Sequence, residues 1–153
     1  MTIAWVLGSR GLLGSALCRS LHLDGTELFF PDGRFGWGCP HALAPQVAEA
    51  VRAFAARVAT AGGWEIYWPA GVSTMSSSES ELAPETQVLS RLLHLIESKP
   101  RLMATPGAIA FASSAGAIYA GSPDYIITEN TSPVPTTAYA RGKLEQEDIV
   151  RSF

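Results

Sequence analysis

Apolar and polar positions alternate along this chain in two different rhythms. Short apolar runs occupy residues 3–7, 27–31, 64–68 and 107–112, a length and continuity typical of buried strands. Residues 12–23, 45–60, 81–98 and 137–150 instead place apolar side chains three or four positions apart, as on one face of a helix. In the first of these helices, Leu13, Leu17 and Leu21 form that face. The pattern predicts an α/β domain with a parallel sheet in the order β-α-β-α-β-α-β-α, and it leaves one strand unaccounted for near residue 36.

Composition narrows the class of protein. The chain has 153 residues, of which 47% are hydrophobic and 16% charged, so it can bury the core of one folded domain. Its formal net charge of −3 argues against nucleic acid as a main partner. Cys18 and Cys39 are too few for a disulfide framework, and His22, His41 and His94 lack the spacing of metal ligands, so we expect no metal. Because no apolar run approaches a membrane span and the start does not resemble a signal peptide, we expect a cytoplasmic protein with no membrane partner.

The first candidate motif lies between the first strand and the first helix and reads GSRGLLG, residues 8–14. A dinucleotide diphosphate needs a turn without Cβ atoms, so that backbone N–H groups and the helix N-terminus can face the phosphates. Gly8 would make the turn, Gly11 would let a phosphate approach, and Gly14 would let the helix lie close to the sheet. The alternative is a tight turn with no ligand, but the strand-turn-helix context favours the binding site.

A carboxylate follows the second strand. Asp32 lies 18 residues after Gly14, where a carboxylate can accept hydrogen bonds from both hydroxyls of an adenosine ribose. The alternative is an ordinary turn aspartate before Gly33. Arg10 and Arg34 could hold a 2′-phosphate, which Asp32 would repel, so the residues favour NAD and leave NADP open.

The third motif is Tyr139-Ala140-Arg141-Gly142-Lys143, at the start of the last predicted helix. Tyr139 and Lys143 are four residues apart and therefore share one helical face. An ammonium beside a tyrosine favours the ionised phenolate, which suits the phenol to proton transfer. The alternative is an accidental pair of surface residues, although the chain contains only two lysines, Lys99 and Lys143.

Two hydroxyl residues, Ser113 and Ser114, follow the strand at 107–112. The carboxyl ends of parallel strands are where open α/β sheets bind ligands. Serine pairs often mark only a loop, but Ser114 stands 25 residues before Tyr139, and either serine could reach a reacting group.

Together, GSRGLLG, WPAG, FASSAGAIYAGSP and TENTSPVPTTAYARGKLEQE resemble the extended short-chain dehydrogenase/reductase family, in its NAD-dependent epimerase/dehydratase branch. The resemblance covers nearly the whole chain. It implies a Rossmann-like, doubly wound parallel sheet in three layers, with NAD or NADP as cofactor and a nucleotide-sugar as substrate. It implies that Tyr139 is the catalytic acid/base, that Lys143 holds the nicotinamide ribose and acidifies Tyr139, and that Ser114 or Ser113 binds the reacting oxygen. The implied cofactor contacts are Gly8, Arg10, Gly11, Leu12, Leu13, Gly14, Asp32, Arg34, Ala70, Gly71, Tyr139 and Lys143.

The chain departs from the family pattern in three places. The third strand and its aspartate-bearing loop are shortened or lost around residues 35–44, and the asparagine common in the fourth helix is replaced in the stretch Glu85-Thr86-Gln87. The segment aligned with the family's serine site runs Ser114-Ala115, which leaves the position of the hydroxyl open by one residue. Family members run to about twice this length, so we expect residues 1–153 to be one NAD(P)-binding Rossmann domain, truncated after the Tyr-X-X-X-Lys helix and lacking the C-terminal substrate domain.

The sequence therefore favours an NAD-dependent epimerase or dehydratase that acts through transient hydride transfer. A non-catalytic NAD(P)-binding module and an inactive fragment of such an enzyme remain the alternatives. The resemblance also implies a homodimer built from the helices at 81–98 and 137–150. Within the first of these helices, residues 92–96 are either core or part of the dimer face, whereas the tryptophans are expected to pack in the core: Trp5, Trp37, Trp64 and Trp68.

Overall fold

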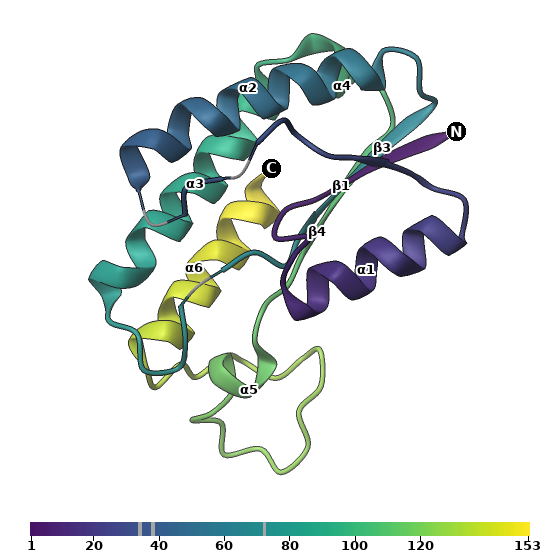
Figure 1. Cartoon of the computed structure of the whole chain (residues 1–153). Coiled ribbons are helices and arrows are strands. Elements are labelled where there is room, and N and C mark those ends of the chain that lie inside the picture. Colours follow the sequence, from purple (N-terminus) through teal and green to yellow (C-terminus); the bar gives the residue numbers. More distant parts are fainter. Residues whose placement is uncertain (34, 38, 72) are drawn as a thin grey trace. The chain divides into compact units, whose positions relative to one another are not determined.

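A computed structural model describes residues 1–33, 35–37, 39–71 and 73–153 of the chain. Its strands are β1 (Thr2–Val6), β2 (Glu27–Phe29), β3 (Gly63–Trp68) and β4 (Gly107–Phe111) (Figure 1). Its helices are α1 (Leu12–Leu23), α2 (Pro40–Val58), α3 (Glu79–Glu97), α4 (Pro100–Ala104), α5 (Ala115–Ile118) and α6 (Ala138–Ser152). All strand pairs are parallel, in the order β2-β1-β3-β4, which confirms the predicted Rossmann-like α/β sheet. The short helices α4 and α5 were not predicted.

The chain forms two compact units. The first contains Met1–Gly71 and Val88–Ala112, and the second contains Val72–Gln87 and Ser113–Phe153. The sheet, α1, α2, α4 and the C-terminal half of α3 belong to the first unit. The N-terminal half of α3, together with α5 and α6, belongs to the second.

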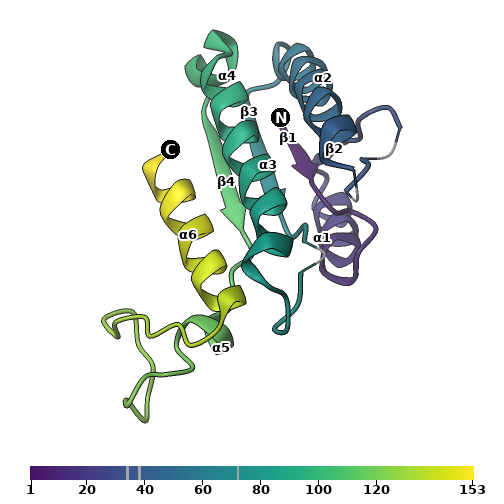
Figure 2. The ribbon, with the colours of Figure 1, turned by 90° about the vertical axis from the view of Figure 1, so that its left-hand side faces the viewer.

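The first unit has three layers, as predicted. Helix α1 packs against β1 and β2, whereas α2 packs against β1 and α4. Figures 1 and 2 show α1 on one face of the sheet and α2 on the other. Apolar strands covered on both faces explain why β1 is a continuous apolar run, with every residue from Ile3 to Val6 buried.

Aromatic side chains fill much of this core. Trp5, Trp64 and Trp68 are each less than 5% exposed, and the ring centroids of Trp5 and Phe54 lie 5.5 Å apart. Trp37 stands edge-on to Trp68, with a centroid distance of 5.9 Å and an interplanar angle of 89°. The packing role expected for the tryptophans is therefore confirmed.

Helix α2 begins five residues before the predicted start at residue 45. Proline is favoured in the first turn of a helix, which made Pro45 a plausible start. The structure instead continues the helix through Pro45, because Leu43 and Val47 are both buried, four positions apart on one face. Burial of this extended face outweighs the backbone hydrogen bond that the proline cannot make.

Strand β4 is not the buried strand that the sequence predicted. Ala108 and Ala110 are exposed, and Ile109 and Phe111 are half-buried. The apolar run is present, but in the described part of the chain β4 pairs only with β3 and is an edge strand. The apolar composition of a strand shows that its side chains can be buried, but the position of the strand in the sheet decides whether they are.

Candidate functional site

The glycine turn between β1 and α1 is required by the fold itself at two of its positions. Gly8 has a φ of +82°, which L side chains rarely adopt, and a Cβ there would lie 3.0 Å from the Cα of Ala70. A Cβ on Gly14 would lie 2.2 Å from the carbonyl oxygen of Gly8. Both glycines thus let α1 and the Pro69-Ala70-Gly71 turn approach the first strand closely.

Gly11 differs from these two glycines. A Cβ on Gly11 would meet only the Gly8 carbonyl oxygen, at 3.4 Å, which is ordinary contact. Gly11 is also the N-cap of α1 and supplies no capping side chain, and the first turn of the helix carries no acidic residue. The absence of a side chain at Gly11 therefore leaves room for a group outside the chain beside the partial positive charge of the helix N-terminus, as a diphosphate requires.

Two leucines follow Gly11 and face outward. Leu12 is 93% exposed and Leu13 is 51% exposed, whereas Leu17 and Leu21 are half-buried. Helix α1 places Leu13, Leu17 and Leu21 on one face as predicted, but Leu13 at the start of that face is more exposed than the other two. Arg10 is exposed as well. These side chains border the open position at Gly11.

Asp32 lies three residues beyond the end of β2, which stops at Phe29 rather than at residue 31. The Asp32 carboxylate is exposed, and Gly33 after it has a φ of +81°, so the turn depends on glycine there. Ala70 is 7% exposed and Gly71 is exposed, just after β3. Because β1, β2 and β3 are parallel, Asp32, the Ala70-Gly71 turn and the glycine turn all follow the carboxyl ends of their strands. Arg34, the other candidate phosphate contact, lies outside the described residues.

The remaining candidate residues belong to the second unit. Ser114 is half-buried and is the N-cap residue of α5, whereas Ser113 is exposed. The Ser114 carbonyl accepts hydrogen bonds from the N–H groups of Ala117 and Ile118, at 2.9 and 3.0 Å. Its hydroxyl does not cap the helix and so keeps its hydrogen-bonding capacity for other groups. A hollow of about 250 Å³ adjoins α5 and is lined by Ala115, Gly116, Tyr119, Ala120 and Ile127.

Tyr139 and Lys143 lie on successive turns of α6. Thr137 fixes the start of that helix, because its hydroxyl accepts a hydrogen bond of 3.1 Å from the N–H of Ala140. The Nζ of Lys143 lies 5.8 Å from the centroid of the Tyr139 ring. Gly142 between them is buried, and a Cβ there would come within 3.3 Å of Leu82 on α3. The glycine therefore allows the two helices of this unit to pack closely beside Lys143.

Lys143 is an unusual lysine because it is only 6% exposed. Its Nζ donates a hydrogen bond of 3.1 Å to the Oε1 of Gln146. The Gln146 Nε2 in turn donates one of 3.1 Å to the hydroxyl of Thr86. Burial lowers the pKa of Lys143 below its ordinary value, and the nearby Glu85 carboxylate partly opposes that shift.

Glu85 is also buried, at 5% exposure. Its Oε1 accepts hydrogen bonds from the backbone N–H and the hydroxyl of Ser73, both at 2.8 Å. The sequence pointed to residues 85–87 only as the place where a family asparagine is missing, and it did not single out Gln146. The three-residue spacing of Lys143 and Gln146 was the available signal, but contact with Thr86 joins positions 60 residues apart and needs the tertiary structure.

The described residues also limit other chemistries. In that part of the chain no group of three His, Cys, Asp or Glu side chains could hold a metal ion. His22, His41 and His94 are all exposed, as expected for surface or helix-end residues. Among the described helices, none is long and apolar enough to cross a membrane.

A parallel sheet with a glycine turn at its carboxyl edge and helices on both faces defines a Rossmann-like protein. Residues 4–153 match the NAD dependent epimerase/dehydratase family, and the chain belongs to that family. A comparison with curated proteins gives no match.

Several solved structures share this fold. UDP-glucose 4-epimerase from Thermus thermophilus, in complex with NAD, has a TM-score of 0.72 and 20% identity over 99% of this chain and 50% of that one. UDP-N-acetylglucosamine 4-epimerase from Bacillus cereus has a TM-score of 0.66 and 18% identity, over 99% and 54%. RMD from Pseudomonas aeruginosa, complexed with NADPH, has a TM-score of 0.69 and 19% identity, over 97% and 48%. At these identities the likeness shows the fold, and the chain spans about half the length of these proteins.

Proposed function

We propose that this chain is the cofactor-binding part of an NAD-dependent epimerase or dehydratase that acts on a nucleotide-sugar. The observation that carries the proposal furthest is the buried Lys143, one helical turn from Tyr139 and 5.8 Å from its ring. A lysine is rarely buried without a role for its charge. Membership of the family and the nucleotide-sugar enzymes among the solved structures support the same class of reaction.

The cofactor proposal rests on the first unit. The residues there fit a dinucleotide. Packing within the chain would tolerate a Cβ at Gly11, so the glycine there keeps the N-terminus of α1 open for a ligand. Gly8, Arg10, Gly11, Leu12, Leu13 and Gly14 would surround the diphosphate, with Ala70 and Gly71 beside it. Asp32 would accept hydrogen bonds from the adenosine ribose, which favours NAD and leaves NADP as the second choice.

The catalytic proposal rests on the second unit. Bound NAD would supply the hydride acceptor for oxidation of a sugar carbinol. Tyr139 would take the proton of the sugar hydroxyl as that carbon becomes a ketone, and it would return a proton when the carbonyl is reduced. The Lys143 ammonium would stabilise the phenolate and bind the nicotinamide ribose, and the Ser114 hydroxyl would hydrogen-bond the reacting oxygen. Its half-buried N-cap position favours Ser114 over the exposed Ser113.

Calorimetric titration of NAD into the chain tests the cofactor proposal. The wild type should bind, and Gly11→Asp should bind far more weakly, because its carboxylate would meet the diphosphate. Equal affinity in the two proteins would leave the glycines with a structural role only. Incubation with NAD and UDP-glucose, followed by NMR of the sugar, then tests turnover.

A second candidate is a non-catalytic NAD(P)-binding module. The observation that favours it is the exposure of strand β4, whose residues are all exposed or only half-buried. It predicts NAD binding with no conversion of any sugar nucleotide, which the same pair of experiments distinguishes.

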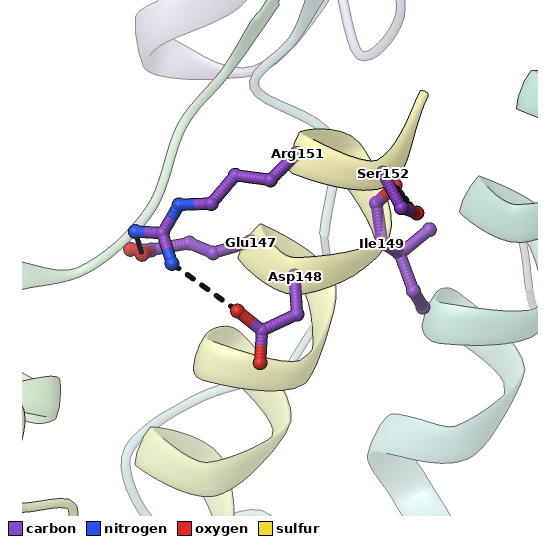
Figure 3. Close-up of polar contacts among 5 residues, drawn as sticks. All are labelled: Glu147, Asp148, Ile149, Arg151 and Ser152. Atoms are coloured by element: carbon purple, nitrogen blue, oxygen red, sulfur yellow. Dashed lines mark hydrogen bonds and ion pairs between the residues drawn. The ribbon is translucent and has the colours of Figure 1, made fainter.

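We also propose a homodimer through α3 and α6. Residues Leu92, Leu93 and Ile96 of α3 are buried in the chain's own core, which leaves α6 as the better-supported face. An open groove of about 520 Å³ runs along α6 and is lined by Arg141, Leu144, Glu145, Asp148, Ile149 and Ser152. Arg151 forms ion pairs with Glu147 and Asp148 at 2.8 and 3.1 Å, and Figure 3 shows Ile149 and Ser152 away from that charged cluster.

A further inference from the structure

A chain of side-chain hydrogen bonds reaches Lys143 from inside the second unit. It runs from the Nζ of Lys143 to the amide of Gln146 and from there to the hydroxyl of Thr86, with both distances 3.1 Å. All three residues are buried, at 6%, 1% and 8% exposure. These two hydrogen bonds link α6 to the N-terminal half of α3, and nothing in the proposed reaction uses Gln146 or Thr86.

The direction of these hydrogen bonds is fixed by the chemistry of the groups. Lysine has only donors, so the Gln146 amide must turn its oxygen toward the Nζ. Its nitrogen then faces Thr86, whose hydroxyl oxygen can accept. Gln146 is therefore held at both ends, and rotation of the amide would place two donors against each other. Such an arrangement fixes the position of an ammonium better than water can, since water exchanges and reorients.

Burial of an ammonium also costs free energy unless acceptors replace its hydration. Burial lowers the pKa of Lys143, and the Glu85 carboxylate on α3 raises it. Among the described residues, the titratable groups beside Lys143 include Glu85 from α3 and Tyr139 from α6 itself. The neutral Gln146 oxygen adds an acceptor without adding a second negative charge near the phenol.

We propose that Gln146, anchored by Thr86, is a positioning residue that holds the Lys143 ammonium in place and in its protonated form beside Tyr139. This role rests on the proposed function for its importance to catalysis. It concerns the chain's own residues, however, and can be measured without a substrate.

Three variants separate the effects of the two hydrogen bonds made by Gln146. Gln146→Leu removes both hydrogen bonds at nearly constant volume. Thr86→Val keeps Gln146 but removes its anchor, and it disturbs the fold less. Gln146→Glu keeps an acceptor toward Lys143, and the Thr86 hydroxyl can turn to donate to the new carboxylate. Ile96→Val, a buried position in the first unit, serves as the control for a general loss of stability.

The primary measurement is NMR titration of protein labelled with ¹³C in its lysines. The chain has two lysines, so Lys143 gives one of two Cε signals and Lys99 is an internal reference. In Gln146→Leu the pKa of Lys143 should fall below its wild-type position, with a smaller fall in Thr86→Val and recovery in Gln146→Glu. Lys99 should not move, and Ile96→Val should match the wild type. If Lys143 titrates alike in the wild type, Gln146→Leu and Thr86→Val, the inference is overturned.

Calorimetry with NAD provides the functional arm. Loss of one positioned hydrogen bond should weaken NAD binding by about 3- to 10-fold in Gln146→Leu, with recovery in Gln146→Glu. Weaker binding in Gln146→Leu with an unchanged Lys143 titration also overturns the inference, because Gln146 would then act by another route. If the wild type does not bind NAD, the proposed function fails, while the lysine titration still decides the role of Gln146.

Discussion

Burial of Lys143 has a cost for folding, and the same residue lies at the centre of the proposed site. It is nearly inaccessible to solvent, and burial lowers its pKa from the ordinary value of 10.5. In the pH range between the folded and unfolded pKa values, the unfolded chain binds more protons than the folded one. The free energy of unfolding therefore rises with pH across this range, and below it the full cost of burying the charge is present.

This sign gives a prediction for Lys143→Met. The variant removes the titrating group while keeping a long side chain, so the pH-dependent term should disappear. The stability of the wild type relative to the variant should improve as the pH rises from neutral toward 10.5, as measured by urea unfolding at several pH values. A constant difference across that range would show that burial does not perturb Lys143. NAD affinity should be weakened in the same variant, because the ammonium is proposed to bind the ribose.

Tyr139→Phe tests the proton-transfer role separately from packing. In the described part of the chain the Tyr139 hydroxyl takes part in no hydrogen bond, so its removal should change the free energy of unfolding by less than about 0.5 kcal/mol. The proposed turnover, tested with UDP-glucose, should be lost, whereas calorimetric NAD affinity should stay within about twofold of the wild type. Retained conversion would rule out Tyr139 as the acid/base.

Asp32 is expected to set the preference between the two cofactors. Its carboxylate is exposed, so solvent screens it, and we expect a preference for NAD over NADP of only about tenfold, or roughly 1.4 kcal/mol. Asp32→Asn should reduce this preference, mainly by improving NADP binding. Tighter binding of NADP than NAD by the wild type would show that the arginines govern the choice.

Among the secondary-structure elements, the turn between β1 and α1 contains glycines that look alike in sequence but differ in whether the packing requires them. Gly14 lets the helix pack on the turn backbone, whereas Gly11 has room for a methyl group. The spacing of the motif predicted the turn and the helix correctly. It could not distinguish the glycine that the packing requires from the one that it does not, because the clash at Gly14 involves the Gly8 carbonyl, whose position depends on the folded backbone.

Paired alanine substitutions test this distinction. Gly14→Ala should lower the free energy of unfolding by about 1–3 kcal/mol, because a Cβ cannot coexist with the Gly8 carbonyl oxygen without a backbone shift. Gly11→Ala replaces an N-cap glycine in the extended region of the backbone and should cost less than about 1 kcal/mol, yet weaken NAD binding about tenfold by obstructing the diphosphate. Denaturant unfolding and calorimetry on both variants measure the two effects. The assignment is wrong if Gly11→Ala destabilises the fold as much as Gly14→Ala.

For the whole molecule, the proposed dimer predicts the molar mass of the protein in solution. Light scattering should report twice the 16.3 kDa of one chain. Ile149→Glu should return it to one chain, because a charge in the apolar part of the α6 groove cannot be buried against a second copy. Leu23→Glu, at an exposed leucine on α1, is the matched control and should leave the mass unchanged. A wild type that is monomeric at all concentrations contradicts the proposal.

The alternation of strands and helices, the parallel sheet and the membership of the family follow from the amino-acid sequence alone. Local periodicity and the glycine, serine and tyrosine-lysine motifs carry that information, because they depend on residues close together in the chain. Tertiary packing was needed to establish that β4 is exposed, that α2 extends through Pro45 and that Gln146 contacts Thr86. Each of these depends on what lies across a strand or helix from a residue, and contacts between distant segments are not encoded in local spacing.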